Sequence, residues 1–161
     1  MIVCLVIDVD DTLFVHKTIG SSIVTDYDMI LPDIKIKQRL QQIPNPKYIL
    51  TNATFGHAND ILNKLDVVDE FKKVYSRDNI PEMKPSLYSY QSVSRDIEIT
   101  SSGHTSNKFI FFDDLVSNLE GAHKVGWNTI WISPDYMNSS KYPYINKAYP
   151  TLIDALKALN F

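Results

Sequence analysis

The stretch Asp-Val-Asp-Asp-Thr-Leu at residues 8–13 directly follows the apolar run Ile-Val-Cys-Leu-Val-Ile at residues 2–7, which predicts a buried strand. Three carboxylates within four positions at the end of such a strand are unfavourable, because like charges in a partly dry site disfavour one another's ionised form. A bound divalent cation can compensate them. A second acidic pair, Asp113-Asp114, follows another apolar run at residues 109–112. Two acidic strand ends in one chain therefore indicate a metal-dependent phosphoryl-transfer site.

The composition is that of an ordinary globular protein, with 161 residues, 44% hydrophobic and 22% charged residues, and a net charge of −3. We therefore expect a single domain over residues 1–161. The slight negative charge argues against a nucleic-acid partner, which would select a basic surface. Cys4 is the single cysteine, which excludes an internal disulfide and fits a reducing compartment. Asp8 interrupts the first apolar run too early for a signal peptide or membrane span, so we expect a cytoplasmic protein without a membrane partner.

Apolar runs of strand length alternate with helical patterns along the chain. We expect five strands, near residues 2–9, 48–50, 73–76, 109–112 and 127–132. The alternation predicts an α/β fold, a doubly wound, Rossmann-like parallel sheet with helices on both faces. Ligands of such sheets bind at the carboxyl ends of the strands, where Asp8, Thr51 and Asp114 fall. Lys84 precedes the helix after the third strand, and Pro85 is expected in the first turn of that helix.

The remaining segments are predicted from composition. Residues 14–31 lack clear periodicity but contain a Gly-Ser-Ser turn and a β-branched run, so they predict a short flap or β-hairpin. The Ser-rich stretch at residues 101–107 predicts a solvent loop. The Tyr- and Asn-rich stretch after residue 132 predicts a connection to a terminal helix.

Four motifs follow one another along the chain: Asp8-Val9-Asp10-Asp11-Thr12, Thr51-Asn52-Ala53, Lys84-Pro85 and Phe112-Asp113-Asp114. With this set the chain resembles the haloacid dehalogenase (HAD) superfamily of phosphohydrolases over most of its length. His57-Ala58 after the second motif, and Asn118 one helical turn after the fourth, look most like the pyrimidine 5′-nucleotidase branch. The resemblance implies a Mg²⁺-dependent phosphomonoester hydrolase and, for that branch, a nucleoside 5′-monophosphate substrate.

The resemblance also implies catalytic roles, which the chemistry of the residues supports. Asp8 is the expected nucleophile, which forms an aspartyl-phosphate and so divides hydrolysis into two steps. Asp10 lies two residues on along an extended backbone and is expected on the same side. It would protonate the leaving oxygen and later deprotonate water. Thr12 is expected to hold the Asp10 side chain, and Lys84 to offset the charge of the phosphate and of Asp8.

Substrate and metal ligands come from the same motifs. The expected catalytic set is Asp8, Asp10, Thr51 and Lys84, and the expected substrate-binding set is Thr12, Thr51, Asn52 and Lys84. Mg²⁺ prefers oxygen ligands. The resemblance assigns it the carboxylates of Asp8 and Asp114 and the backbone carbonyl of Asp10. Asp113 is a further ligand or holds metal-bound water.

Other polar residues have structural interpretations. Asp11 stands where many relatives carry glycine, and we expect it to face solvent. The four histidines, His16, His57, His104 and His123, lack metal-ligand spacing, so structural or surface roles are expected. His57 follows the second motif closely and could also line the substrate pocket.

The chain departs from the nucleotidase branch between its first two motifs, where relatives carry a helical cap. Residues 33–43 are already predicted as a core helix, which leaves residues 14–31, too short a stretch for such a domain. We therefore expect a minimal cap and an open site. A small phosphorylated substrate is the first expectation, with a neighbouring subunit of a homo-oligomer as a possible lid. A phosphoprotein or nucleic-acid end is the alternative.

Two classes of protein other than enzymes are alternatives: a phosphoacceptor receiver domain and a non-catalytic phosphate-binding protein. A phosphoacceptor receiver domain also combines strand-end aspartates with Thr and Lys, but it places the acidic pair on the first strand and the phosphorylated aspartate on the third. This chain does not fit that order. A non-catalytic phosphate-binding protein with the same fold would not require the full set of catalytic side chains, which the chain retains.

Overall fold

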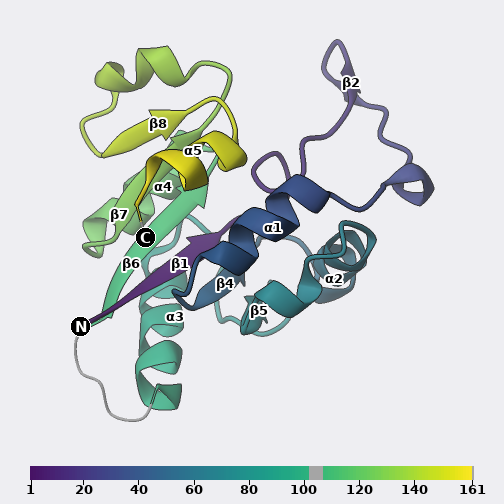
Figure 1. Ribbon diagram of the computed structural model, residues 1–161. Coiled ribbons are helices and arrows are strands. Elements are labelled where there is room, and N and C mark those ends of the chain that lie inside the picture. Colours follow the sequence, from purple (N-terminus) through teal and green to yellow (C-terminus); the bar gives the residue numbers. More distant parts are fainter. Residues whose placement is uncertain (102–106, 161) are drawn as a thin grey trace.

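A computed structural model describes residues 1–101 and 107–160 (Figure 1). Its centre is a six-stranded sheet in the order β5-β4-β1-β6-β7-β8, in which every neighbouring pair is parallel. The strands are β1 (Ile2–Ile7), β4 (Lys47–Leu50), β5 (Lys73–Tyr75), β6 (Asn107–Asp113), β7 (Asn128–Ile132) and β8 (Lys147–Tyr149). The predicted doubly wound α/β sheet is confirmed. The strand order reverses at β1, so the expected ligand site lies at the carboxyl ends of β1, β4 and β6.

The sheet has one strand more than the five predicted. β8 lies in the stretch that was expected to be a connection, and it pairs with β7 in the register Trp131↔Ala148. An edge strand of three residues, followed directly by Pro150, is too short to show the alternation by which strands are found in a sequence.

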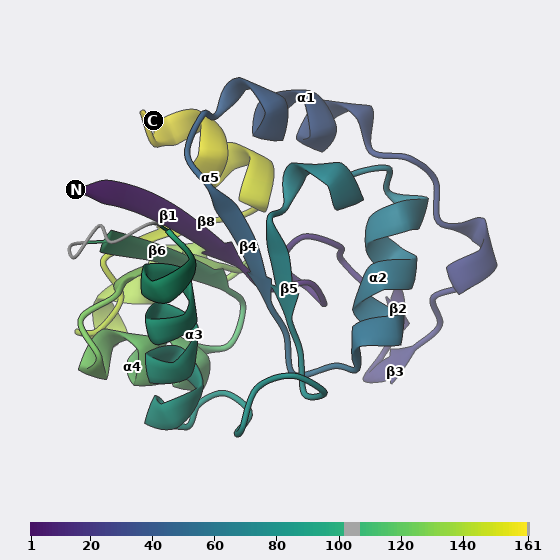
Figure 2. The ribbon, with the colours of Figure 1, turned by 90° about the horizontal axis from the view of Figure 1, so that it is seen from below.

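In residues 1–101 and 107–160, five α-helices cover the two faces of the sheet (Figure 2). They are α1 (Ile34–Gln42), α2 (Phe55–Lys64), α3 (Leu87–Thr100), α4 (Val116–Lys124) and α5 (Leu152–Ala158). Alternate residues of β1 point to opposite faces: Leu5 and Ile7 pack with α1, α2 and α5, whereas Cys4 and Val6 pack with α3 and α4. Burial on both faces explains why β1 is an uninterrupted apolar run. None of the helices in the two described ranges is long and apolar enough to cross a bilayer.

The helix after Lys84 begins later than predicted. Ser86 is the N-cap of α3, and its hydroxyl accepts the N–H of Tyr88. Pro85 therefore precedes the helix instead of lying in its first turn. Of the predicted solvent loop, Ser101 is the C-cap of α3 and Asn107 begins β6, and residues 102–106 lie outside the described residues.

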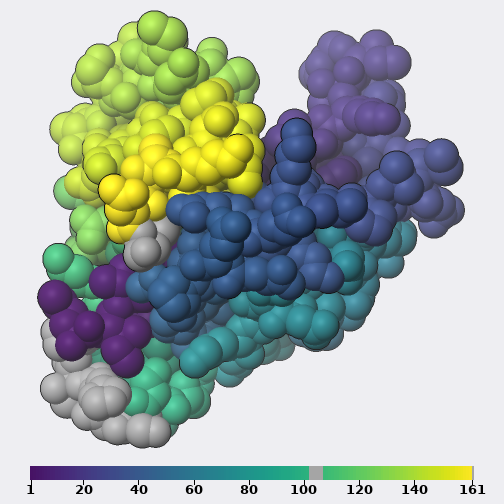
Figure 3. Space-filling view, viewed as in Figure 1, coloured from purple at the N-terminus to yellow at the C-terminus, as the bar shows by residue number. Residues whose placement is uncertain are grey.

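The segment between β1 and α1 forms the predicted short flap. It contains a hairpin of β2 (Thr18–Ile19) and β3 (Ser22–Ile23) and one turn of 3₁₀ helix at Tyr27–Met29. Ile19 and Ile23 of the hairpin are 74% and 60% exposed. Figure 3 shows the flap standing apart from the C-terminal helix. The flap is much smaller than a helical cap domain, as the sequence predicts.

Candidate active site

Three carboxylates meet at the carboxyl ends of β1 and β6. Asp8 follows β1 directly, Asp113 is the last residue of β6, and Asp114 is the next residue. The parallel register aligns Ile7 with Phe112, and the N–H of Asp8 donates to the carbonyl of Phe112 at 3.0 Å. One carboxylate oxygen from each aspartate lies within 4.8 Å of the other two. The structure thus brings the two predicted acidic strand ends into one cluster.

Lys84 is the cation of this cluster. Its Nζ donates to Asp8 Oδ1 at 2.9 Å, to Asp113 Oδ2 at 2.8 Å and to the carbonyl of Leu50 at 2.8 Å. The side chain is buried, and burial alone would lower its pKa, but the adjacent Asp113 and Asp8 carboxylates outweigh that effect and raise the pKa. Asn52 fixes the position of Lys84, because its amide accepts the Lys84 N–H and donates to the Lys84 carbonyl.

The negative charge of the cluster exceeds the single positive charge of Lys84. Burial raises the pKa of Asp8 well above its usual range, and the carboxylates of Asp113 and Asp114 add to this effect against the attraction of Lys84. Burial and the neighbouring Asp113 raise the pKa of Asp114 to about 6. A divalent cation would relieve both effects, and carboxylate oxygens are the ligands that Mg²⁺ prefers. The donor set therefore fits Mg²⁺.

The three aspartates differ in how many hydrogen bonds their carboxylate oxygens already accept from the protein. Asp113 Oδ1 accepts the N–H of Leu115, and both of its oxygens accept from Asn118 Nδ2 at 3.2 Å. Asp113 Oδ2 also accepts from Lys84. Asp8 and Asp114 accept fewer hydrogen bonds from the protein, so their oxygens would be more available to a metal ion than those of Asp113, which pairs with Lys84.

Thr12 does not hold Asp10, which corrects the prediction from sequence. Its Oγ1 lies 3.1 Å from Asp8 Oδ2 and 3.3 Å from Asp114 Oδ1. The cause is a turn: β1 ends at Ile7, and the N–H groups of Leu13 and Phe14 both donate to the carbonyl of Val9. The extended backbone assumed for the stretch from Asp8 to Asp10 therefore does not continue.

Asp10 is held instead by two histidines. His16 Nε2 and His57 Nε2 lie 2.6 and 2.9 Å from the same oxygen, Asp10 Oδ1. Burial tends to raise the pKa of Asp10, but the hydrogen bonds from His57 and His16 outweigh it and lower the pKa below its usual value. His16 and His57, for which structural or surface roles and, for His57, a place in the substrate pocket are predicted, therefore both contact the candidate acid–base.

The structure also describes Thr51, Asp11 and His123. Thr51 is buried directly after β4, and its hydroxyl accepts the N–H of Ala53 at 3.1 Å, which leaves the hydroxyl proton available for a ligand. Asp11 is exposed, as predicted, with a φ of 59°, and its carboxylate accepts the N–H of His16. His123 is exposed on α4, and His104 lies outside the described residues.

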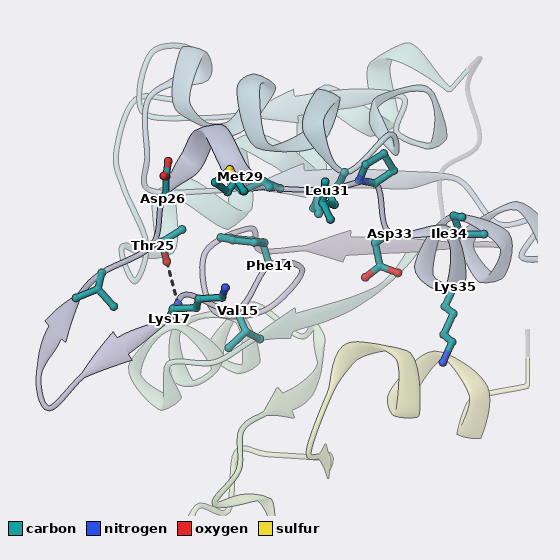
Figure 4. A pocket seen from close by; sticks show the side chains of 14 residues that line it. Phe14, Val15, Lys17, Thr25, Asp26, Met29, Leu31, Asp33, Ile34 and Lys35 are labelled. Carbon is teal, nitrogen blue, oxygen red and sulfur yellow. Dashed lines mark hydrogen bonds between the residues drawn. The ribbon is translucent and has the colours of Figure 1, made fainter.

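A pocket of about 670 Å³ lies beside this site, between the flap and the start of α1 (Figure 4). Apolar side chains such as Phe14, Met29 and Leu31 line it, together with Thr25 and Lys17. The carboxylate cluster is not part of its lining. The pocket therefore belongs to the flap and not to the reacting centre.

The fold is that of the HAD-like hydrolases, as comparison with solved structures shows. L-2-haloacid dehalogenase from Xanthobacter autotrophicus is 18% identical, with a TM-score of 0.61 over 81% of this chain. YfnB from Bacillus subtilis, described as a putative HAD-hydrolase and bound to magnesium, is 20% identical, with a TM-score of 0.64 over 78% of this chain. A predicted phosphoglycolate phosphatase from Haemophilus somnus is 17% identical, with a TM-score of 0.61 over 78% of this chain.

This chain covers 62%, 54% and 56% of the lengths of those three proteins. No protein-family model matches the sequence. Similarity at this level of identity defines the fold, while the reaction has to be argued from the site.

Proposed function

We propose that this chain is a Mg²⁺-dependent phosphomonoester hydrolase that acts through an aspartyl-phosphate on Asp8. The observation that carries the proposal is the cluster of Asp8, Asp113 and Asp114, whose oxygens lie within 4.8 Å of one another beside Lys84. Such a cluster suits a phosphoryl group, whose transfer depends mainly on positioning and on neutralisation of charge.

Dehalogenases share the fold, so the fold does not distinguish phosphomonoester hydrolysis from dehalogenation, whereas the side chains of the site favour the first. A halide leaves carbon without a proton, whereas an alkoxide leaving phosphorus needs one. Asp10 follows Asp8 by two residues in the sequence, and one of its oxygens is held by two histidines, which suits a group that gives and takes protons. The excess carboxylates favour a dication, and phosphoryl oxygens need that charge more than a carbon centre does.

In the first step of the proposed reaction, Asp8 attacks phosphorus while the bond from phosphorus to the leaving oxygen breaks. Asp10 gives that oxygen its proton. The pKa of Asp10 is low in the free protein, and the anionic phosphoryl group raises it by like charge, so proton uptake by Asp10 accompanies substrate binding.

In the second step, Asp10 takes a proton from water as the water oxygen attacks phosphorus. The bond from phosphorus to Asp8 breaks, so phosphate leaves and both aspartates return to their initial state. Lys84 stays paired with the Asp8 side chain, and the Thr51 hydroxyl and the Asn52 backbone amide serve as donors to phosphoryl oxygens.

Mg²⁺ would be held by the carboxylates of Asp8 and Asp114, with Asp113 beside them and the Asp10 backbone carbonyl as a further ligand. When bound, it supplies positive charge to the phosphoryl oxygens and to Asp8.

The small size of the flap is relevant to the class of substrate. A hairpin with two-residue strands and exposed Ile19 and Ile23 is far smaller than a cap domain, which supports the proposal of an open site. A small phosphomonoester, with a nucleoside 5′-monophosphate as one candidate, is the first substrate class that we propose, and a second subunit could cover it. The exposed hairpin favours one alternative, a phosphoprotein or nucleic-acid end.

The test is phosphate release from nitrophenyl phosphate with Mg²⁺, with EDTA, and by Asp8→Asn. We expect release only from the wild-type protein with Mg²⁺. Turnover by Asp8→Asn at the wild-type rate would disprove the proposed nucleophile. Release of halide from a haloacid, without phosphate release, would favour the dehalogenase reaction. A parallel screen of nucleotides, sugar phosphates and phosphopeptides separates the substrate classes.

A further inference from the structure

We propose that His16 and His57 are positioning residues that clamp one oxygen of Asp10 and turn its other oxygen toward the reacting phosphoryl group. The inference rests on the proposed phosphatase function and adds residues to it. Both hydrogen bonds fall on Oδ1, at 2.6 Å from His16 and 2.9 Å from His57. A carboxylate fixed at one oxygen keeps the other in a constant direction for proton transfer.

The contact with Asp10 determines which nitrogen of His16 carries a proton, because an ionised carboxylate only accepts hydrogen bonds and Nε2 is the atom 2.6 Å from it. The N–H of Lys17 donates to Thr25 Oγ1 at 2.9 Å, so the Thr25 hydroxyl proton is free to be donated elsewhere. Thr25 Oγ1 lies 3.2 Å from His16 Nδ1. Nδ1 can therefore accept the Thr25 hydroxyl proton while the N–H at Nε2 donates to Asp10.

His57 reaches Asp10 from a different element. It lies in the first turn of α2, where its N–H donates to the hydroxyl of the N-cap Thr54 at 3.2 Å. The ring of Tyr27 packs edge-on against both histidines, with centroids 5.8 Å from His16 and 5.5 Å from His57. The flap and α2 together therefore hold Asp10, while the sheet holds Asp8. The flap therefore contributes a residue, His16, that positions the proposed acid–base Asp10.

This arrangement predicts a particular kinetic signature. Departure of an aryl leaving group needs little help from an acid, whereas departure of an alkyl group needs a proton, and hydrolysis of the aspartyl-phosphate needs Asp10 as a base for every substrate. Loss of a clamping histidine should therefore spare the first step for aryl phosphates and slow the second step. In that case kcat and KM fall together, because the phosphoenzyme accumulates.

The test compares His57→Leu, which removes the donor, with His57→Gln, whose amide can donate to the same oxygen. His57 is part-exposed, so these variants should fold. His123→Leu is the matched control, because His123 is exposed on α4. For His57→Leu with nitrophenyl phosphate we expect kcat and KM each to fall about tenfold and kcat/KM to stay within about threefold; with an alkyl phosphate, kcat/KM should fall about tenfold. His57→Gln should recover most of both losses.

Other results would overturn the clamp. These are a fall in kcat at constant KM for the aryl substrate, equal losses of kcat/KM for both substrates, or a glutamine variant no better than leucine. Thr25→Val, which removes the hydroxyl behind His16, should show the same signature more weakly; wild-type kinetics in that variant would remove His16 from the proposal.

A measurement without turnover separates this inference from the proposed function. Nitrogen-15 NMR of labelled histidine should show a proton on Nε2 of both His16 and His57, with both signals displaced in Asp10→Ala and unchanged in His123→Leu. An unprotonated Nε2 on either ring, or signals insensitive to Asp10→Ala, would refute the clamp. A wild-type protein that releases no phosphate would instead refute the proposed function, and the NMR result would still decide the clamp.

Discussion

Replacing Lys84 with methionine removes the cation that pairs with Asp8 and Asp113 while keeping a side chain of similar length. Lys84 Nζ donates to Asp8, Asp113 and the carbonyl of Leu50 at 2.8–2.9 Å, and only 4% of the residue is exposed. Loss of one partner from a buried ion pair costs about 3–5 kcal/mol, because the other charge stays buried and unpaired. That is a large part of a typical stability of about 5–15 kcal/mol.

The loss should depend on pH in a defined direction. Burial already raises the pKa of Asp8, and removal of Lys84 raises it further, so the variant takes up a proton on folding. A carboxyl whose pKa is higher in the folded than in the unfolded state lowers stability as pH rises. The loss in Lys84→Met should therefore be greater at pH 8 than at pH 5, by about 1 kcal/mol or more.

The assay is urea unfolding in EDTA at both pH values, with Lys47→Met as the matched control. Lys47 is also buried, but its Nζ donates to the carbonyls of Ile43 and Asn45. Its removal leaves no carboxylate unpaired, so we expect a loss of about 1–2 kcal/mol that hardly changes with pH. A Lys84→Met loss no greater than that of Lys47→Met, or one that is constant with pH, would refute this reasoning. If Lys84→Met does not fold at pH 8, adding Asp113→Asn should restore folding, because it removes one unpaired charge.

Two further predictions concern stability. Burial raises the pKa of Asp114 to about 6, so this group lowers the stability of the metal-free protein as pH rises from about 4 to about 6. Asp114→Asn should flatten that part of a urea-unfolding pH profile by about 1 kcal/mol after allowance for solvent screening, and an unchanged profile would contradict the burial effect. A Cβ on Gly121 would lie 2.6 Å from the carbonyl of Pro85 and 2.8 Å from the ring of Tyr90, so Gly121→Ala should cost about 1–3 kcal/mol in thermal unfolding. Gly56→Ala, at a helical position with open space, is its control and should be neutral or stabilising by up to about 1 kcal/mol; equal losses would contradict the packing argument.

The sequence predicted the parallel sheet and the acidic cluster because both follow from local patterns. The residues of β1 bury on two faces, which makes an uninterrupted apolar run, and the carboxyl ends of parallel strands meet at one edge. Asp8, Asp113 and Asp114 therefore had to lie together once their strands were assigned. β8 could not be predicted in this way, because its three residues at the edge of the sheet are too few to show an alternation of apolar and polar residues.

The surroundings of Asp10 could not be predicted in the same way. His16 and His57 come from the flap and from α2, and they converge on Asp10 through tertiary packing around Tyr27. Neither residue has a spacing or motif that indicates this contact. The error over Thr12 has a local cause, since the tight turn after β1 breaks the alternation of an extended strand.

The central claim, that Asp8 is the nucleophile, is tested most directly by trapping the intermediate. Wild-type protein with Mg²⁺ and a phosphomonoester is quenched in acid during turnover, and its peptides are mapped by mass spectrometry. We predict one added phosphoryl group on the peptide that carries Asp8, and none in Asp8→Asn. Steady phosphate release without phosphoryl on that peptide, or with phosphoryl on another residue, would contradict the account.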